Sequence, residues 1–92
     1  MIKVQEFMPS ALADALRKAP LSPEKTAFAW RAAVGASVDH VTRVELRGHV
    51  LRVRARDAAW RREIERSIGM IRSRLNALLG DDVVKSIEVG IE

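Results

Sequence analysis

The sequence predicts an α+β fold in which helices cover one face of a three-stranded mixed sheet and leave the other face open. Two neighbouring segments, residues 43–47 and 51–56, alternate apolar and charged side chains, as strands with one buried and one wet face do. Residues 83–92 alternate in the same way, whereas the other segments show helical spacing. The predicted order is therefore α-α-β-β-α-β, and the final strand–helix–strand unit favours two parallel strands.

A length of 92 residues suits one small domain with a modest core, and we take residues 1–92 as a single domain. Residues 1–8 show no clear pattern and form a poorly defined N-terminal segment, although Phe7 and Met8 are candidates for packing on the core. Pro9 suits the first turn of a helix, where its missing N–H costs nothing. The apolar residues that follow at helical spacing, before Pro20 ends the run, are Leu12, Ala15, Leu16 and Ala19.

The second helix has a strong start. Ser22 suits the N-cap, Pro23 the first helical position, and Glu24 the positive end of the helix dipole. Its predicted apolar face consists of Ala27, Trp30, Val34 and Val38. Gly35 either bends this helix or lets another backbone approach closely.

The two alternating segments predict a β-hairpin, because Gly48 lies between them and a tight turn needs a residue that tolerates positive φ. The turn centres either on Arg47 and Gly48 or on Gly48 and His49. These registers differ by two residues, so both keep the apolar side chains on one face and the arginines on the other.

After the hairpin, Asp57 suits the N-cap of the longest helix, and Gly80 suits its end. The apolar stripe between them consists of Trp60, Ile64, Ile68, Ile71, Leu75, Leu78 and Leu79. Asp81 and Asp82 then turn the chain into the last strand. The predicted core of the domain consists of Trp30, Val34, Val44, Leu46, Leu51, Val53, Trp60, Ile64, Ile68, Leu75, Ile87 and Val89.

The net charge of +4 is concentrated in one part of the chain. Between Arg43 and Arg66, eight arginines meet four acids, whereas eight basic and eight acidic residues lie outside this window. Arginine suits bidentate contacts with phosphate or carboxylate. The pattern indicates either a solvated strand face or a binding surface for an anionic partner, and charge alone does not separate nucleic acid from an acidic protein.

The hairpin register strengthens the second interpretation. In either register Arg43 faces another arginine, Arg52 or Arg54, and like charges directly opposite are destabilising unless something screens them. An anionic partner would explain this arrangement. The residues predicted to bind nucleic acid or a protein partner are Arg43, Arg47, Arg52, Arg54, Arg56, Arg61 and Arg62. Trp60 is a candidate for stacking on a base, although core packing is the simpler explanation for it.

The sequence gives little support to an enzyme, because it has no nucleophile–base pair, no glycine-rich phosphate loop and no shared pair of carboxylates. His40 and His49 are isolated and cysteine is absent, so we expect no catalytic residue, no metal site, no cofactor and no small-molecule substrate. Neither a signal peptide nor an apolar run of about 20 residues is present, so we expect a cytoplasmic protein without membrane contact.

Several segments occur in an order typical of one bacterial family. They are Trp30-Arg-Ala-Ala-Val34-Gly35, the hairpin from Val44 to Val53, Asp57-Ala-Ala-Trp60, the stretch from Ile71 to Gly80, and the Val-x-x-Ile-x-Val strand from Val84 to Val89. Together they resemble the DciA family, formerly classed as a domain of unknown function. The resemblance covers roughly residues 10–91.

The resemblance implies a KH-like fold and a non-enzymatic role, in which the protein binds the replicative DNA helicase and single-stranded DNA to assist helicase loading. KH domains clamp nucleic acid with a Gly-x-x-Gly loop between two helices, which Val34-Gly35-Ala36-Ser37 does not match. Many family members also carry a basic tail beyond this domain, whereas this sequence ends at Glu92. A basic protein-binding adaptor and a general nucleic-acid-binding module without a helicase role are the alternatives.

Overall fold

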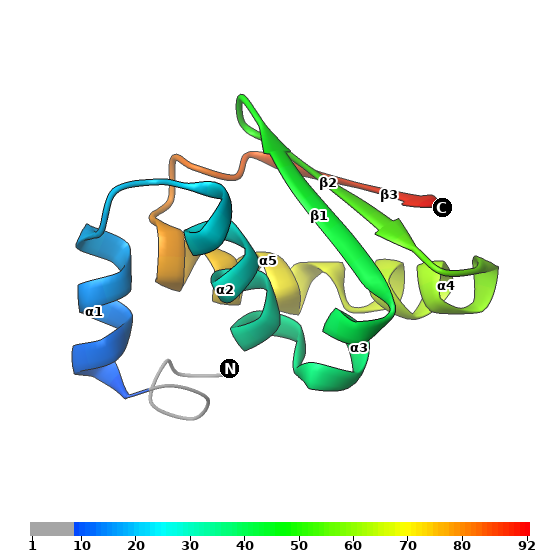
Figure 1. Ribbon diagram of the computed structural model, residues 1–92, viewed down its shortest axis with the longest axis horizontal. Coiled ribbons are helices and arrows are strands. Elements are labelled where there is room, and N and C mark those ends of the chain that lie inside the picture. The colour runs from blue at the N-terminus through cyan, green and yellow to red at the C-terminus, as the bar shows by residue number, and fades with distance from the viewer. Residues whose placement is uncertain (1–8) are drawn as a thin grey trace.

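The computed structural model describes residues 9–92, so the predicted packing of Phe7 and Met8 falls outside it. The described chain forms five helices and three strands (Figure 1). In chain order they are α1 (Ser10–Lys18), α2 (Pro23–Val34), α3 (Ala36–His40), β1 (Thr42–Arg47), β2 (Val50–Ala55), α4 (Ala58–Arg66), α5 (Ile68–Leu79) and β3 (Ser86–Ile91).

The strands form a mixed sheet in the order β1-β2-β3, with β1 and β2 antiparallel and β2 and β3 parallel. Arg47 pairs with Val50, so the hairpin turn centres on Gly48 and His49, the second of the two predicted registers. Gly48 has a φ of 58°, the left-handed conformation that glycine adopts most easily.

The helices lie on one face of the sheet, as predicted (Figure 1). α2 contacts β1, α4 contacts β2 and β3, and α5 packs against α1 and α2. On β2 the side chains directed toward the helices are buried and the alternate arginines are exposed. The predicted α+β architecture is therefore confirmed, whereas the KH-like character stays a prediction.

The core contains the predicted residues, in two degrees of burial. Fully buried among them are Trp30, Leu51, Val53, Ile64 and Leu75, and half-buried against this cluster are Val34, Val44, Leu46, Trp60, Ile68, Ile87 and Val89. The core also contains Ala13, Ala29, Ala33, Ala55, Ile71, Leu78, Leu79 and Val84. Small residues therefore form much of the surface through which α1 and α2 pack.

The second predicted helix is divided at Gly35. This residue ends α2 and precedes α3 with a φ of 87°, so Val38 lies on a separate short helix. No atom lies within 4 Å of a Cβ added at Gly35, so the glycine permits a sharp bend rather than a close backbone approach. Within α2 the prediction for Ala27 is wrong: this residue is exposed, whereas Ala29 and Ala33 are buried beside Trp30.

The predicted long helix is also divided, at Ser67. The N–H of Ser67 bonds to the carbonyl of Ile64 at 3.0 Å, a three-residue step that tightens the last turn of α4 before α5 begins. Ile68 is the first residue of α5 and only half-buried, whereas Ile64 and Ile71 on either side of the break are buried.

The predicted N-caps of α2 and α4 are confirmed, whereas Pro9 precedes α1 as its N-cap and does not lie in its first turn. The Ser22 hydroxyl accepts a hydrogen bond from the N–H of Lys25 at 3.0 Å, and the Asp57 carboxylate accepts one from the N–H of Trp60 at 3.0 Å. The last strand begins at Ser86, later than the alternation predicts, because residues 81–83 form a turn. The N–H of Lys85 then bonds to the carbonyl of His49 at 2.8 Å as the chain enters the sheet.

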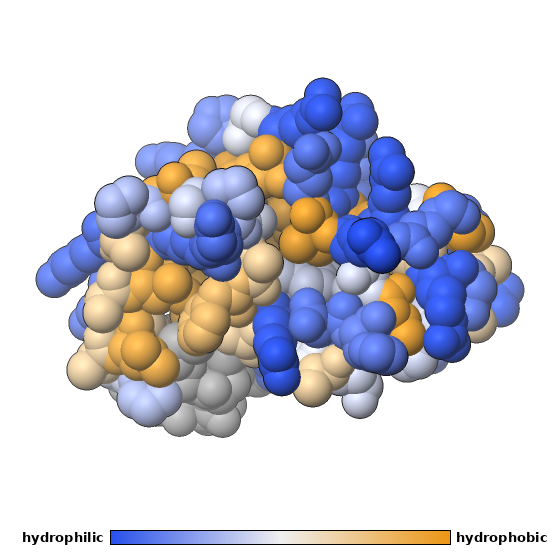
Figure 2. All heavy atoms as spheres, in the orientation of Figure 1, coloured by the Kyte–Doolittle hydropathy of each residue, from blue (hydrophilic) through white to orange (hydrophobic). Residues whose placement is uncertain are grey.

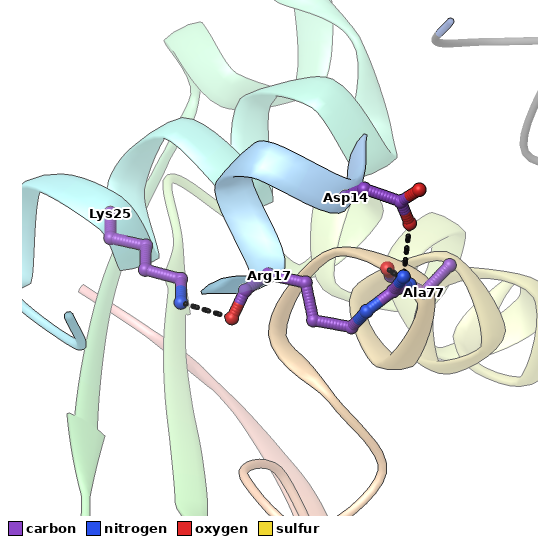
Figure 3. A network of polar contacts seen from close by, with 4 residues as sticks. All are labelled: Asp14, Arg17, Lys25 and Ala77. Carbon is purple, nitrogen blue, oxygen red and sulfur yellow. Dashed lines mark hydrogen bonds and ion pairs between the residues drawn. The ribbon is translucent and has the colours of Figure 1, made fainter. Parts of the chain in front are cut away.

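Helix α1 is fixed to the rest of the fold by polar contacts (Figure 3). The buried Lys25 ammonium donates to the carbonyls of Arg17 at 3.2 Å and Ala19 at 2.6 Å, which satisfies the C-terminal end of α1. Arg17 pairs with Asp14 and donates to the carbonyl of Ala77 in α5 at 3.0 Å. The predicted apolar stripe of α1 is less buried than expected, since Leu12 is 49% exposed and Ala13 is buried instead.

Candidate nucleic-acid interface

The hairpin presents five exposed arginines on the face of the sheet opposite the helices. Strand alternation places them there, because their apolar neighbours face the core. We call this surface, formed by Arg43, Arg47, Arg52, Arg54 and Arg56, the arginine face. Figure 2 shows hydrophilic side chains gathered along the hairpin, with hydrophobic surface beside them.

The register confirms that two arginines lie directly opposite each other, Arg43 on β1 and Arg54 on β2. The N–H of Arg56 bonds to the carbonyl of Val41 at 2.9 Å, so these two residues form a hydrogen-bonded pair of the antiparallel ladder. Hydrogen-bonded and non-hydrogen-bonded pairs alternate along the ladder, so Arg43 and Arg54, two positions further on, also form a hydrogen-bonded pair. Cα atoms in such pairs are about 5.5 Å apart, the wider of the two spacings in an antiparallel sheet. Repulsion between these two arginines is therefore reduced and still present.

Strand β3 adds acids to this face that the hairpin sequence does not indicate. Glu45 and Glu88 flank Arg52 in the middle row of the sheet, and Glu92 reaches Arg43 with its Oε1 atom 2.8 Å from Nε. Five arginines and three glutamates leave the side chains of this face with a net charge of +2. The sequence indicates that Glu88 and Glu92 lie on the exposed face of their segment, since they alternate with Val89 and Ile91. Only the pairing of β3 with β2 shows that they lie beside the arginines.

The ion pairs on this face are exposed. Arg47 lies 2.9 Å from Glu45, Arg52 lies 3.7 Å from Glu88, and the side chain of Arg43 is 84% exposed. Such pairs contribute about 0–1 kcal/mol each. A phosphate or another carboxylate can therefore replace a glutamate at small cost.

Arg54 differs from its neighbours because it forms no ion pair within residues 9–92. Its neighbour on β3 is Gly90, which has no side chain to offer it. Arg54 lines a shallow hollow together with Arg43, Arg47, Arg52, Val44 and Glu45. Four of the seven predicted arginines therefore meet in one concave area, and Arg56 follows at the end of β2, 3.6 Å from Asp57.

The other three predicted residues lie on α4, outside this hollow. Arg62 is exposed, and Arg61 is half-buried with its Nε 3.8 Å from Glu65. Trp60 is half-buried against the core and lines a small apolar pocket with Val34 and Val38. Core packing thus accounts for Trp60, which does not line the hollow of the arginine face.

The fold and this surface define a small α+β protein with a basic, open sheet face. The chain belongs to the DciA family, since the family described as "Dna[CI] antecedent, DciA" matches residues 3–89, nearly its whole length. Membership supports a role in bacterial DNA replication. No curated protein sequence matches the chain. No helix among residues 9–92 is long and apolar enough to cross a membrane.

Proposed function

We propose that this protein is a cytoplasmic, non-enzymatic accessory factor of DNA replication that binds the replicative helicase and single-stranded DNA and assists helicase loading. Family membership supports the role in replication. The observation that supports the DNA-binding part is the arginine face: an arginine without an ion pair among residues 9–92 and its weakly paired neighbours line one hollow. The predicted KH-like fold belongs to the same proposal.

The arginine face suits a sugar–phosphate backbone. Guanidinium groups bind phosphate oxygens in a bidentate manner and also stack on unpaired bases, which single strands expose. Backbone contacts carry little sequence information, so binding should be nearly indifferent to base sequence. Each phosphate contact also releases counterions, so affinity should fall steeply with salt.

The arginines differ in how readily they can bind phosphate, because they differ in the ion pairs that they would have to break. Arg54 has no acidic partner to lose within the described chain, and the 3.7 Å contact between Arg52 and Glu88 is loose. Arg43 and Arg47 must release closer partners, at 2.8 and 2.9 Å. We therefore expect Arg52 and Arg54 to make the principal contacts, with Arg43, Arg47 and Arg56 at the sides and Arg61 and Arg62 more remote.

The test is the double variant Arg52→Gln/Arg54→Gln. Both side chains point to water, so the variant should fold as the parent does. For single strands the slope of log K against log salt changes by about 0.7 per phosphate contact, so two lost contacts should flatten it by about 1.4. Taking 1 M salt as the reference, this slope corresponds to roughly 25-fold weaker binding at 0.1 M.

A matched control removes the same charge elsewhere. Lys18→Gln/Arg31→Gln also lowers the net charge by two, at exposed positions on α1 and α2. If both variants lose affinity equally, the effect is that of net charge and the arginine face is not the DNA site. If the Arg52→Gln/Arg54→Gln variant binds as the parent does across the salt series, the proposal is also wrong.

The helicase part of the proposal needs a separate readout. The parent chain, immobilised, should retain the replicative helicase of the same bacterium in a pull-down. A chain that binds the helicase but no DNA would be the protein-binding adaptor. Loss of helicase retention in the Arg52→Gln/Arg54→Gln variant, with DNA binding intact, would assign the arginine face to the protein partner instead.

A further inference from the structure

The β1 edge of the sheet is a second surface, which adjoins the arginine face and shares Val44 and Glu45 with its hollow. Strand β1 has a partner on one side only, because β2 lies between it and β3. The Arg56–Val41 hydrogen bond fixes which of its backbone groups are used: Arg43, Glu45 and Arg47 bond to β2. The N–H and C=O groups of Val44 and Leu46 therefore point away from the sheet, and no hydrogen bond to them is formed within residues 9–92.

An apolar groove runs beside this free edge. It lies between β1 and the start of α2 and is lined by Leu21, Ser22, Pro23, Thr26, Val44, Glu45 and Leu46. Leu21 is 53% exposed, and Val44 and Leu46 are only half-buried although they face the helices. Hydrophobic surface is visible between the hairpin and the start of α2 (Figure 2). Neither the core nor the arginine face explains why these side chains remain accessible.

We propose that this edge and groove bind an extended peptide segment of a partner protein, one that alternates apolar and acidic residues, by strand addition to β1. A strand added there would bond to the backbone of Val44 and Leu46. Its side chains on the helix side would enter the groove beside Leu21 and Pro23. Its alternate side chains would lie on the open side, opposite Arg43, Glu45 and Arg47.

The charge of the residues around this edge favours an acidic peptide. The three residues of β1 on the open side carry a net charge of +1, and the whole face to which they belong carries +2. Acidic side chains in the added strand would therefore be attracted, and opposite charges across neighbouring strands stabilise a sheet. A second copy of this chain, with its net charge of +4, would bring basic residues to a basic edge.

The probe is a blocked eight-residue peptide that alternates valine and aspartate, followed by NMR of the labelled protein. It should shift and protect the amides of Val44 and Leu46, and the matched valine–lysine peptide should bind at least about tenfold more weakly. Two further probes carry N-methyl groups on all valines or on all aspartates. Only one set of amides faces β1, the valines in an antiparallel complex and the aspartates in a parallel one, so only one version should lose binding.

Two variants test the protein side. Val44→Pro removes an outward N–H that has no partner within residues 9–92, and proline is tolerated at sheet edges. Leu21→Asp places a carboxylate in the groove at an exposed position, so it stays informative if the proline variant is unstable. Each should weaken the valine–aspartate peptide about tenfold or more, whereas the matched control Leu12→Asp, at a similarly exposed site on α1, should not.

Several outcomes would overturn the proposal. One is that the two N-methylated peptides bind equally well or lose affinity equally. Another is that Leu21→Asp and Leu12→Asp weaken binding of the valine–aspartate peptide equally. A third is that the peptide shifts only amides of the arginine face. Dimerisation of the parent that Val44→Pro or Leu21→Asp abolishes would show that a second copy occupies the edge instead. None of these measurements depends on DNA binding, so they leave the function proposed for the arginine face untouched.

Discussion

A substitution at Gly90 should change the stability of this protein and its proposed DNA binding in opposite directions. It lies on β3 beside Arg54, on the open side of the sheet, and a Cβ added there meets no atom within 4 Å. Its φ is not in the left-handed range, so other residues can adopt this backbone conformation. Gly90→Glu would therefore add a side chain without a clash and place a carboxylate next to the arginine that forms no ion pair within the described chain.

The expected effects have opposite signs. Replacing a strand glycine stabilises by roughly 0.5–1 kcal/mol, and an exposed ion pair with Arg54 adds about 0–1 kcal/mol. The free energy of unfolding, measured in urea, should thus rise by roughly 0.5–2 kcal/mol. Neutralising Arg54 removes one phosphate contact, which flattens the salt slope by about 0.7 and weakens single-stranded DNA binding roughly fivefold at 0.1 M salt.

Gly90→Gln is the matched control. It provides the same backbone effect and nearly the same shape without the charge, so it should be stabilised and should bind DNA as the parent does. Equal DNA affinity of the Glu and Gln variants would refute the role of Arg54. A loss of stability in both would show that the space beside Gly90 is needed for packing.

Two further predictions concern the fold, and urea unfolding checks both. Ile64→Ala should lower the free energy of unfolding by about 2–5 kcal/mol because Ile64 is 2% exposed. Ile68→Ala should lower it by only about 1–2 kcal/mol because Ile68 is half-buried. Equal losses would contradict the difference in burial between the two residues on either side of the break at Ser67. Asp57→Ala should cost about 1 kcal/mol by removing the N-cap of α4, with Asp57→Asn nearly neutral as the control. An unchanged free energy in Asp57→Ala would show that the cap is not needed.

The hairpin and the helix starts could be predicted because each depends on local chemistry. The alternation of apolar and charged residues over residues 42–55 predicts two strands, and Gly48 adopts the left-handed conformation of the turn between them. Ser22 and Asp57 cap their helices with their side chains. The choice between the two hairpin registers depends on hydrogen-bond geometry, which alternation alone does not contain. The face that carries the arginines was predictable because both registers agree on it.

The helix breaks could not be predicted from periodicity. Ile64, Ile71 and Leu75 keep their side chains in the core across the break at Ser67, so the apolar spacing reads as one continuous stripe. The buried alanines, such as Ala29 and Ala33, also escaped prediction. Their methyl groups give little hydrophobic signal, and only close packing of helices shows that a larger side chain would not fit.

The sequence predicts that the arginines of the hairpin share one face, and it does not predict which acids lie beside them. The arginines of β1 and β2 meet because they belong to adjacent strands, whereas Arg61 and Arg62 lie on α4 and do not line the hollow. The acids that pair with Arg43 and Arg52 are Glu92, directly after β3, and Glu88 on β3, and their positions depend on the parallel pairing of β3 with β2. The groove beside β1 joins residues 21–26 to residues 44–46, a proximity that tertiary packing alone creates.

The central claim is that the arginine face assists the loading of the replicative helicase onto single-stranded DNA. The most direct measurement is the rate at which the helicase of the same bacterium loads onto closed circular single-stranded DNA, read from the release of an annealed oligonucleotide. We predict that the parent chain accelerates loading, that Lys18→Gln/Arg31→Gln does so equally, and that Arg52→Gln/Arg54→Gln does not. Acceleration by the Arg52→Gln/Arg54→Gln variant as large as that by the parent, or none by the parent itself, would contradict the claim.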